Sequence, residues 1–399
     1  MTKKTLKISA IVLILLVVAL GAYYFLLSGD ASVAGGKKPF FGNLFPFGDT
    51  PVVTEVPFST STPIIADVPL GAFEQKVRLI SNEPIAGSIF IASTTGDIVR
   101  YIEKATGHVF DVPTYENKTT RISNTTIPQI YKAEFTESGA GFIAQYIKDT
   151  DSIETFYGKL TGEGVEKNIV GTILSRSIIS FTVSPDGKNI FTLEGRVAGS
   201  EGYVSKPDGS NKKLIWSSPL KEFIPLFMSN TQVSLTSKPH SSSVGVMFRI
   251  NTGTGSKDTL LSNELNLSTL PNTNQASVLY SNSTSLLNFN MLTGSATELS
   301  PKTFPEKCVW ASTKSFVYCA VPKSNIGGGS LYSWYRGEVS YSDDIWEYDI
   351  VNNIAQKIID LEDLAGRSID ISTISINKTD SLLLIESKID GSLWTVKLD

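Results

Sequence analysis

Residues 174–216 read LSRSIISFTVSPDGKNIFTLEGRVAGSEGYVSKPDGSNKKLIW and carry the signals of four short antiparallel strands. Two alternating apolar runs, 178–183 and 189–193, flank the turn Ser-Pro-Asp-Gly at 184–187. Proline presets the backbone for a turn, and glycine accepts the positive φ that a tight hairpin needs. A third run at 202–205 ends in another Pro-Asp-Gly turn, and a polar fourth run follows it. Four strands in this order predict one blade of a β-propeller.

The third strand of this unit recurs along the chain, typically as an apolar strand that enters a Thr-Gly, Asp-Gly or Asn-Asn turn. Its aligned positions in the seven copies are Phe110, Tyr157, Val204, Phe248, Phe289, Tyr348 and Trp394. Their spacing of about 40 to 60 residues is close to the length of a propeller blade. The chain is therefore predicted to be all-β and to fold as a seven-bladed β-propeller.

The seventh copy reaches Asp399 before an outermost strand could form. Residues 74–80 precede the first blade and have no inner strands of their own, so they are predicted to complete the seventh sheet. Such a closure removes the free sheet edges at which chains otherwise associate. We therefore predict one propeller domain over residues 73–399.

The N-terminal part of the chain predicts a membrane anchor. Residues 8–27 are uncharged and, as a helix, would be about 30 Å long, enough to cross a bilayer. Three lysines lie within residues 1–7, which the positive-inside rule keeps in the cytoplasm. We expect a signal anchor in the cytoplasmic (inner) membrane and an extracytoplasmic propeller. The alternative is a signal peptide cleaved near Ala19-Leu20-Gly21.

Residues 28–72 form a Pro/Gly-rich stretch with prolines too frequent for regular sheet or helix. A semi-extended linker between the membrane and the propeller is predicted. The whole chain has a net charge of −4, whereas nucleic-acid binding needs a basic surface that neutralises phosphates. Nucleic acid is therefore not expected among the partners.

The sixth repeat carries an insert at residues 322–344, between its second and third strands. Loops of this kind lie on the face of a propeller where the loops between blades also lie. The candidate binding residues here are Tyr332, Trp334, Tyr335, Arg336, Tyr341, Asp343 and Asp344. Aromatic and arginine side chains dominate binding hot spots, which favours a recognition surface. The alternative is that these rings only pack the insert onto its blade.

The two cysteines, Cys308 and Cys319, lie at equal distances from the centre of a hairpin near residues 313–314. A four-residue loop would make them a non-hydrogen-bonded pair, where side chains approach closely enough for a disulfide. A disulfide would suit an extracytoplasmic domain. The alternative is two reduced thiols packed between the strands.

The sequence offers little support for catalysis. Its two histidines, His108 and His240, have no serine, cysteine or carboxylate at a recognisable triad spacing, and no Gly-x-Ser-x-Gly motif occurs. We expect no catalytic residue, no cofactor and no metal site. Carboxylates from different blades could still converge in the channel, so an envelope glycan hydrolase is the alternative.

The segments SPDGKNIF and PDGSNKKL, at 184–191 and 207–214, are similar to the WD40-like repeat of TolB-type propellers. The anchor, the proline-rich linker and the sixth blade with its Ser-Trp-Tyr-Arg-Gly insert also resemble uncharacterised membrane-anchored propellers of candidate-phylum bacteria. The resemblance implies a fold and a setting but no activity. The expected function is a non-catalytic binding or scaffold module for a protein or an envelope glycan at the channel face.

Overall fold

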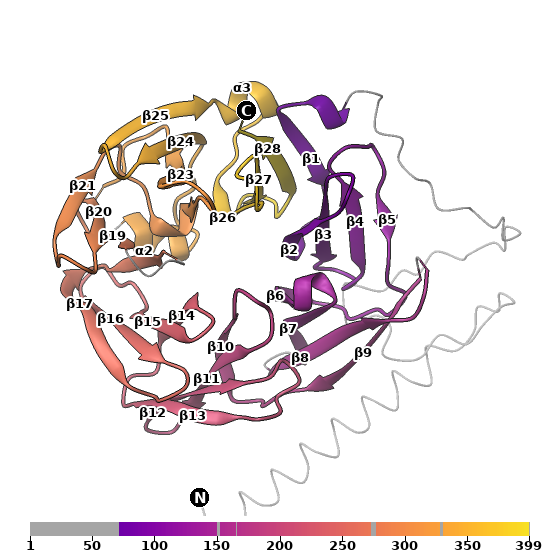
Figure 1. Ribbon diagram of the computed structural model, residues 1–399, viewed down its shortest axis with the longest axis horizontal. Helices are drawn as coiled ribbons and strands as arrows, with labels where there is room; N and C mark the ends of the chain where they lie inside the picture. Colours follow the sequence, from indigo (N-terminus) through magenta and orange to yellow (C-terminus); the bar gives the residue numbers. More distant parts are fainter. Residues whose placement is uncertain (1–71, 150–151, 165, 273–276, 328–329, 399) are drawn as a thin grey trace, which may run out of the picture. The chain divides into compact units, whose positions relative to one another are not determined.

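The computed structural model describes residues 72–149, 152–164, 166–272, 277–327 and 330–398. These residues form seven antiparallel sheets of four strands each, arranged as the blades of a ring (Figure 1). The all-β seven-bladed propeller predicted from the repeats is confirmed.

Blades 1 to 6 follow the order of the chain, and in Figure 1 the first strands of blades 1 to 4, labelled β2, β6, β10 and β14, lie innermost. Blade 1 consists of β2 (Ile85–Ala92), β3 (Asp97–Glu103), β4 (Val109–Pro113) and β5 (Thr120–Arg121). Blade 2 consists of β6 (Ile130–Thr136), β7 (Gly141–Asp149), β8 (Ser152–Thr161) and β9 (Asn168–Ile173). Blade 3 consists of β10 (Ile178–Val183), β11 (Ile190–Arg196), β12 (Gly199–Ser205) and β13 (Lys213–Ser218).

The next three blades repeat the same arrangement. Blade 4 consists of β14 (Phe223–Ser229), β15 (Gln232–Ser237), β16 (Val244–Asn251) and β17 (Lys257–Leu265). Blade 5 consists of β18 (Ser268–Pro271), β19 (Ser277–Ser281), β20 (Leu286–Asn290) and β21 (Ala296–Leu299). Blade 6 consists of β22 (Cys308–Trp310), β23 (Phe316–Pro322), β24 (Asp343–Asp349) and β25 (Ile354–Ile359).

Blade 7 joins the two ends of the described chain. It consists of β26 (Ile371–Ile376), β27 (Leu382–Ser387) and β28 (Leu393–Lys397), with β1 (Val77–Ser81) as its fourth strand. In the antiparallel register of β1 and β28, Val77 lies opposite Val396 and Leu79 lies opposite Trp394. A strand from the start of the domain thus completes the last sheet.

Helical elements are short in the described chain. The 3-10 helices are η1 (Ala72–Glu74), η2 (Glu137–Gly139) and η3 (Pro305–Lys307), and the α-helices are α2 (Ser330–Tyr335) and α3 (Leu361–Ala365). Of these, α2 lies in the insert between β23 and β24, and in the view of Figure 1 it is drawn within the outline of the ring.

The turn of the clearest repeat follows from its residue types. In the β10–β11 hairpin, the Gly187 backbone N–H donates to the Ser184 carbonyl oxygen at 2.7 Å, and Gly187 has a φ of 69°. The Ser184 hydroxyl donates to the Asp186 carboxylate at 2.7 Å. The glycine supplies the left-handed backbone and the short polar side chains bind within the turn, as expected of such residues.

The hydrophobic core lies between adjacent blades because side chains of a strand alternate between its two faces. Within β11, Phe191 packs with Phe223 of blade 4, whereas Ile190 packs with Ile143 of blade 2. Strands of this kind are apolar on both faces, and each blade is stabilised by its two neighbours.

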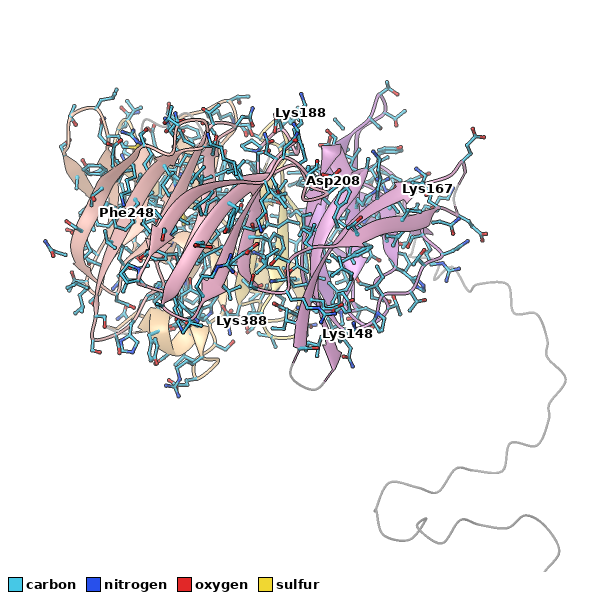
Figure 2. All side chains as sticks on the ribbon, turned by 90° about the horizontal axis from the view of Figure 1, so that it is seen from below. Lys148, Lys167, Lys188, Asp208, Phe248 and Lys388 are labelled. Carbon is cyan, nitrogen blue, oxygen red and sulfur yellow. A yellow bond between two sulfur atoms is a disulfide. The ribbon has the colours of Figure 1, made fainter. Side chains whose placement is uncertain are left out.

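The two faces of the ring carry different loops. Lys148 and Lys388, at connections between second and third strands, lie on the face where the insert projects (Figure 2). Lys188 and Asp208, in turns between first and second or third and fourth strands, lie on the opposite face (Figure 2). We call the first of these the insert face.

The predicted anchor at residues 8–27 and almost all of the predicted linker lie outside the described residues. Within residues 72–398, apart from the gaps given above, no helix is long and apolar enough to cross a membrane.

Candidate functional site

The insert of blade 6 is packed onto the ring by apolar side chains of α2. Leu331 and Trp334 are buried and pack with Phe304, which precedes η3. The centroids of the Phe304 and Trp334 rings lie 5.8 Å apart. These contacts turn one side of α2 into part of the core.

A cluster of buried charges lies beneath the insert. The Lys307 ammonium lies 2.6 Å from Asp343 Oδ2 and 2.5 Å from Asp370 Oδ1, and all three side chains have an exposed fraction of 0%. The Trp334 indole N–H donates to Asp370 at 3.0 Å. Charges removed from water are tolerated only when they are paired and hydrogen-bonded. The cluster therefore holds together η3, the insert, β24 and the segment before β26.

The end of the insert is tied to the same carboxylate. The Ser340 hydroxyl and the Tyr341 backbone N–H donate to Asp370 Oδ2 at 2.9 and 3.1 Å. Burial raises the pKa of Asp343 to about 6, although the nearby Lys307 ammonium and the Ile371 N–H act in the opposite direction. One carboxylate of the cluster thus binds a proton more readily than an exposed aspartate does.

A second polar contact anchors the last residue of α2. The Tyr335 hydroxyl donates to the Glu306 carboxylate, which also accepts from the Ser268 hydroxyl at 2.5 Å. Burial raises the pKa of both Glu306 and Tyr335. Tyr335 therefore connects the insert with blades 5 and 6.

The outer side of α2 carries a group of rings and one guanidinium. The Tyr332 ring lies 4.8 Å from the His240 ring, and the Arg336 guanidinium lies 5.5 Å from the Tyr332 ring centroid. His240 belongs to the exposed connection between β15 and β16 of blade 4. The insert therefore reaches from blade 6 to blade 4.

Exposed apolar side chains accompany this group on the insert face. They lie at or beside connections between second and third strands, or between blades, and are Ile147, Ile153, Val197, Leu220, Val244 and Ile389. Val197, at the tip of the β11–β12 turn, is 99% exposed. These side chains come from blades 2, 3, 4 and 7, and other exposed apolar side chains, such as Leu292 and Val351, lie in turns of the opposite face.

The structure divides the seven candidate binding residues into two sets. Trp334 and the two aspartates are buried, which corrects the expectation of a single surface cluster. Asp343 and Asp344 lie in β24, opposite Pro322 and Val321, because the sheet continues further than the sequence pattern indicated. The side chains that keep surface exposure are Tyr332, Tyr335, Arg336 and Tyr341. The insert thus both packs onto the ring and presents residues outward.

Four residues of this site were missed by the sequence reasoning. They are Glu306, Lys307, Asp370 and His240. The first three are separated from their partners by other strands and have no local signature. One sequence feature could have pointed to His240: like the insert, it lies in a connection between the second and third strands of a blade.

The structure places a disulfide between Cys308 and Cys319. The two residues lie directly opposite each other on β22 and β23, with their Cα atoms 4.0 Å apart. Both side chains are buried in the core of blade 6. The bridge joins the two inner strands next to η3, which carries Lys307.

Other candidate chemistry remains sparse in the described chain. No group of three or more His, Cys, Asp or Glu side chains within it has the arrangement of a metal site. The His108 Nε2 lies 3.2 Å from the Thr126 hydroxyl, and burial lowers the pKa of His108. On the innermost strand of blade 2, Glu134 forms an ion pair with Lys132 at 2.9 Å.

Comparison with protein-family models gives no match, and no curated protein matches the chain. Among solved structures, the chain is similar to the tricorn protease, with 8% identity and a TM-score of 0.50 over 81% of this chain and 34% of that one. It spans about a third of that protein's length. It is also similar to an oligogalacturonate lyase in complex with manganese, with 11% identity and a TM-score of 0.51 over 82% of this chain and 98% of the lyase. At such identities the likeness establishes the fold alone, and the chain is a seven-bladed β-propeller.

Proposed function

We propose that the protein is a non-catalytic binding module that recognises a partner protein on its insert face. The observation that carries the proposal is the two-sided character of α2. Its inner side is held by the buried contact of Trp334 with Asp370, while Tyr332 and Arg336 remain at the surface beside His240. Recognition residues on a rigid support lose little conformational freedom on binding, which favours affinity.

The surroundings favour a protein over an envelope glycan. The exposed apolar side chains of the insert face, such as Val197 and Val244, are suited to the apolar centre of a protein interface. A glycan site would instead need several side chains that hydrogen-bond to sugar hydroxyl groups, placed around a flat aromatic ring. An aromatic ring and a guanidinium are the kinds of side chain that are enriched in protein-binding hot spots.

The setting we propose is the outer side of the cytoplasmic membrane, with residues 8–27 as a single-pass anchor. The length and charge pattern of that segment support the anchor. The disulfide between Cys308 and Cys319 supports an oxidising compartment. A relationship to TolB-type propellers and to membrane-anchored propellers of candidate-phylum bacteria is part of this proposal and rests on the segments at 184–191 and 207–214 and on the anchor.

Photo-crosslinking in the native cell tests the proposal. A photoreactive residue at position 338, an exposed position of the insert, should capture a discrete protein, and the same residue at position 208, on the opposite face, should not (Figure 2). The His240→Ala substitution should reduce capture from position 338, because it removes the ring beside Tyr332. Equal capture from positions 338 and 208, or capture that is unchanged in His240→Ala, would contradict recognition at the insert.

The second candidate is an enzyme that acts on envelope glycan in the channel. It is favoured by Glu134, a partly exposed carboxylate on innermost strand β6, and by a solved oligogalacturonate lyase with the same fold. This alternative requires turnover of cell-wall glycan that Glu134→Gln abolishes without unfolding the protein. Saturable binding without product would reject it.

A further inference from the structure

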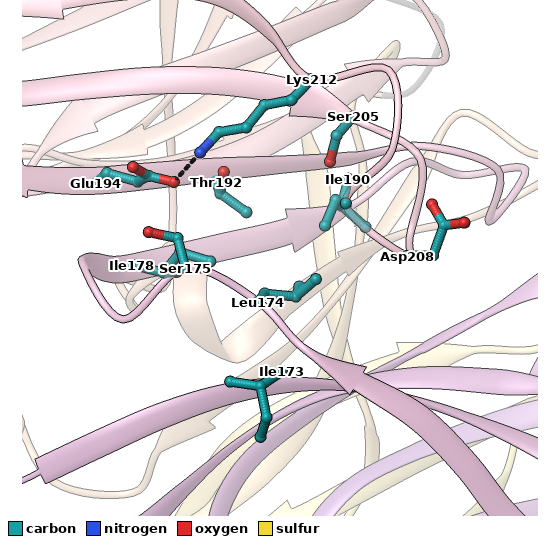
Figure 3. Close-up of a pocket in the computed structure, with 11 residues that line it drawn as sticks. Ile173, Leu174, Ser175, Ile178, Ile190, Thr192, Glu194, Ser205, Asp208 and Lys212 are labelled. Carbon is teal, nitrogen blue, oxygen red and sulfur yellow. Dashed lines mark hydrogen bonds and ion pairs between the residues drawn. The ribbon is translucent and has the colours of Figure 1, made fainter.

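A pocket of about 370 Å³ lies between blades 2 and 3, and no residue of the insert lines it (Figure 3). One wall is formed by the end of β9 and the segment that follows. The other is formed by β11 and the turn between β12 and β13. Its volume is at the small end of the range for ligand pockets, roughly 300 to 1,000 Å³.

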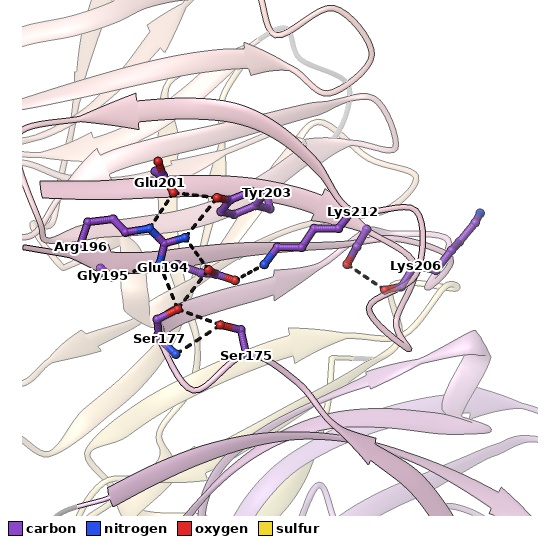
Figure 4. Close-up of polar contacts among 10 residues, drawn as sticks. Ser175, Ser177, Glu194, Gly195, Arg196, Glu201, Tyr203, Lys206 and Lys212 are labelled. Carbon is purple, nitrogen blue, oxygen red and sulfur yellow. Dashed lines mark hydrogen bonds and ion pairs between the residues drawn. The ribbon is translucent and has the colours of Figure 1, made fainter.

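The charged groups at one end of the pocket are paired with one another (Figure 4). Glu194 accepts hydrogen bonds from the Lys212 ammonium at 2.5 Å and the Arg196 guanidinium at 2.9 Å. The Arg196 Nε also donates to Glu201 at 2.7 Å. Two cations thus face two carboxylates at this end, and the remaining lining carboxylate, Asp208, is exposed to solvent, so a charged ligand would gain little net attraction here.

The carboxylate of Glu194 stays ionised although its side chain is only 3% exposed. Burial by itself raises the pKa of Glu194, but the hydrogen bonds from Lys212 and Arg196 outweigh it, and the pKa is lowered. The paired arrangement therefore persists at neutral pH.

Hydrogen-bonding capacity nevertheless remains inside the pocket. Thr192 is 3% exposed and lines the pocket, and its hydroxyl has no hydrogen-bond partner among the described residues. Lys212 has three N–H donors; one is placed on Glu194, and the ammonium also lies 4.1 Å from the Tyr203 ring centroid, which leaves capacity for one further hydrogen bond. At the other end, Asp208 Oδ1 accepts from Ser210, while Oδ2 has no partner in the described chain. Donors and acceptors are thus both available.

The space between these polar groups is lined by aliphatic side chains. Ile173, Leu174, Ile178 and Ile190 contribute to the lining, and Ile178 and Ile190 belong to the core between blades 2 and 3 (Figure 3). A ligand must therefore present an apolar C–H surface as well as groups that donate and accept hydrogen bonds.

We propose that this pocket binds a neutral, hydroxyl-rich molecule of the size of a single sugar ring. Hydroxyl groups both donate and accept, which suits Thr192, Lys212 and Asp208, and the C–H face of a sugar suits the aliphatic lining. The site is independent of the insert face, so it goes beyond the protein recognition proposed above.

The test is saturation-transfer NMR on the full-length chain in a detergent that contains no sugar. The probes are glucose, galactose, mannose and N-acetylglucosamine, with glucuronate and glucosamine as charged analogues. We expect at least one neutral sugar to bind in the millimolar range typical of ligands with about twelve heavy atoms. Absence of binding by every neutral sugar would overturn the proposal, as would a charged analogue that binds tenfold more tightly than its neutral parent.

Matched variants locate the signal. Thr192→Val removes the free hydroxyl at nearly constant shape and should weaken binding about fivefold. Ile173→Asn changes a lining residue that is 45% exposed, and Val170→Asn changes the same strand at a position 59% exposed outside the pocket. Binding should fall with Ile173→Asn and persist with Val170→Asn, while both unfold at the same temperature. Equal losses in the two variants would place the binding elsewhere.

Discussion

Lys307 and Asp370 form an ion pair in which the ammonium nitrogen lies 2.5 Å from Oδ1 and both side chains are completely buried. Asp370 is also the acceptor for the indole N–H of Trp334. The Asp370 carboxylate therefore joins η3, which directly precedes blade 6, to helix α2 of the insert. Because the pair is enclosed, neither water nor salt can replace the missing partner when one is removed.

Lys307→Met should lower the free energy of unfolding by about 3 kcal/mol, since it leaves the buried carboxylates of Asp343 and Asp370 without their cation. Urea denaturation measures the change. The matched control is Asp258→Asn, which removes an ion pair with Arg249 at 3.0 Å whose carboxylate side chain is 66% exposed. That control should change stability by less than about 1 kcal/mol. Similar losses in the two variants would contradict the role given to the buried pair.

The free energy of unfolding should depend on the protonation of Asp343. Its pKa is raised from 3.8 to about 6 by burial, so between about pH 4 and pH 6 the folded protein holds a proton that the unfolded chain has released. This group therefore makes the folded state more stable as the pH falls through that window, and less stable as the pH rises. Urea titrations at pH 4.5 and pH 7 should show a smaller pH dependence for Asp343→Asn than for the native protein. An unchanged dependence would exclude Asp343 as its source.

Arg78 links the closing strand β1 to blade 1, and its loss should loosen the ring. Its guanidinium donates to the carbonyl oxygens of Pro113 at 3.0 Å and Glu116 at 2.9 Å, and the residue is buried. Arg78→Met should lower the free energy of unfolding by about 2 kcal/mol, because it leaves two acceptors without their donor. Lys76→Met, at an exposed position beside β1, is the control and should have little effect. Equal stability of the two variants would show that Arg78 does not hold the ring closed.

Reduction of the disulfide should destabilise blade 6 by at most about 3 kcal/mol, because the bridge closes a short loop. The sequence separation of Cys308 and Cys319 is 11 residues. Both are buried, so alkylation of the native protein should fail without a denaturant even when a mild reductant is present. Mass spectrometry of the unreduced peptide measures the bridge directly. Free thiols in freshly purified protein would contradict it.

Tyr332→Ala should weaken binding of the partner captured at the insert by tenfold or more, as expected for an aromatic residue at the centre of an interface. The unfolding temperature should not change, because Tyr332 is only half-buried. Leu292→Ala serves as the control, since Leu292 lies in the turn between β20 and β21 on the opposite face and is 85% exposed. A loss of binding with Leu292→Ala alone would move the interface to that face.

Much of the fold could be predicted because strands and turns depend on residues that are close together in the sequence. Alternation of apolar residues specifies strands, and turns such as Ser184–Gly187 specify the hairpins that join them. Strand ends were less predictable: β12 begins at Gly199, three residues before the run at 202–205. Hydrogen-bonding to a neighbouring strand extends a sheet beyond the residues whose own pattern favours it.

Less of the candidate site than of the fold could be predicted from the sequence. The insert and its aromatic residues were visible in the sequence, but the inward orientation of Trp334 was not, because it depends on the carboxylate of Asp370 in the segment that leads to blade 7. Lys307 and Asp370 are 63 positions apart, and no sequence pattern near either residue predicts the ion pair between them.

By itself, the sequence determined the strands, the turns and the number of blades, because each of these depends on residues within a few positions of one another. It also placed Cys308 opposite Cys319, since the two share one hairpin. Only the tertiary structure decided which charges are buried together, which side of α2 faces outward, and that Tyr332 meets His240 of blade 4. Those contacts join different blades, and closing the ring is what brings them within reach.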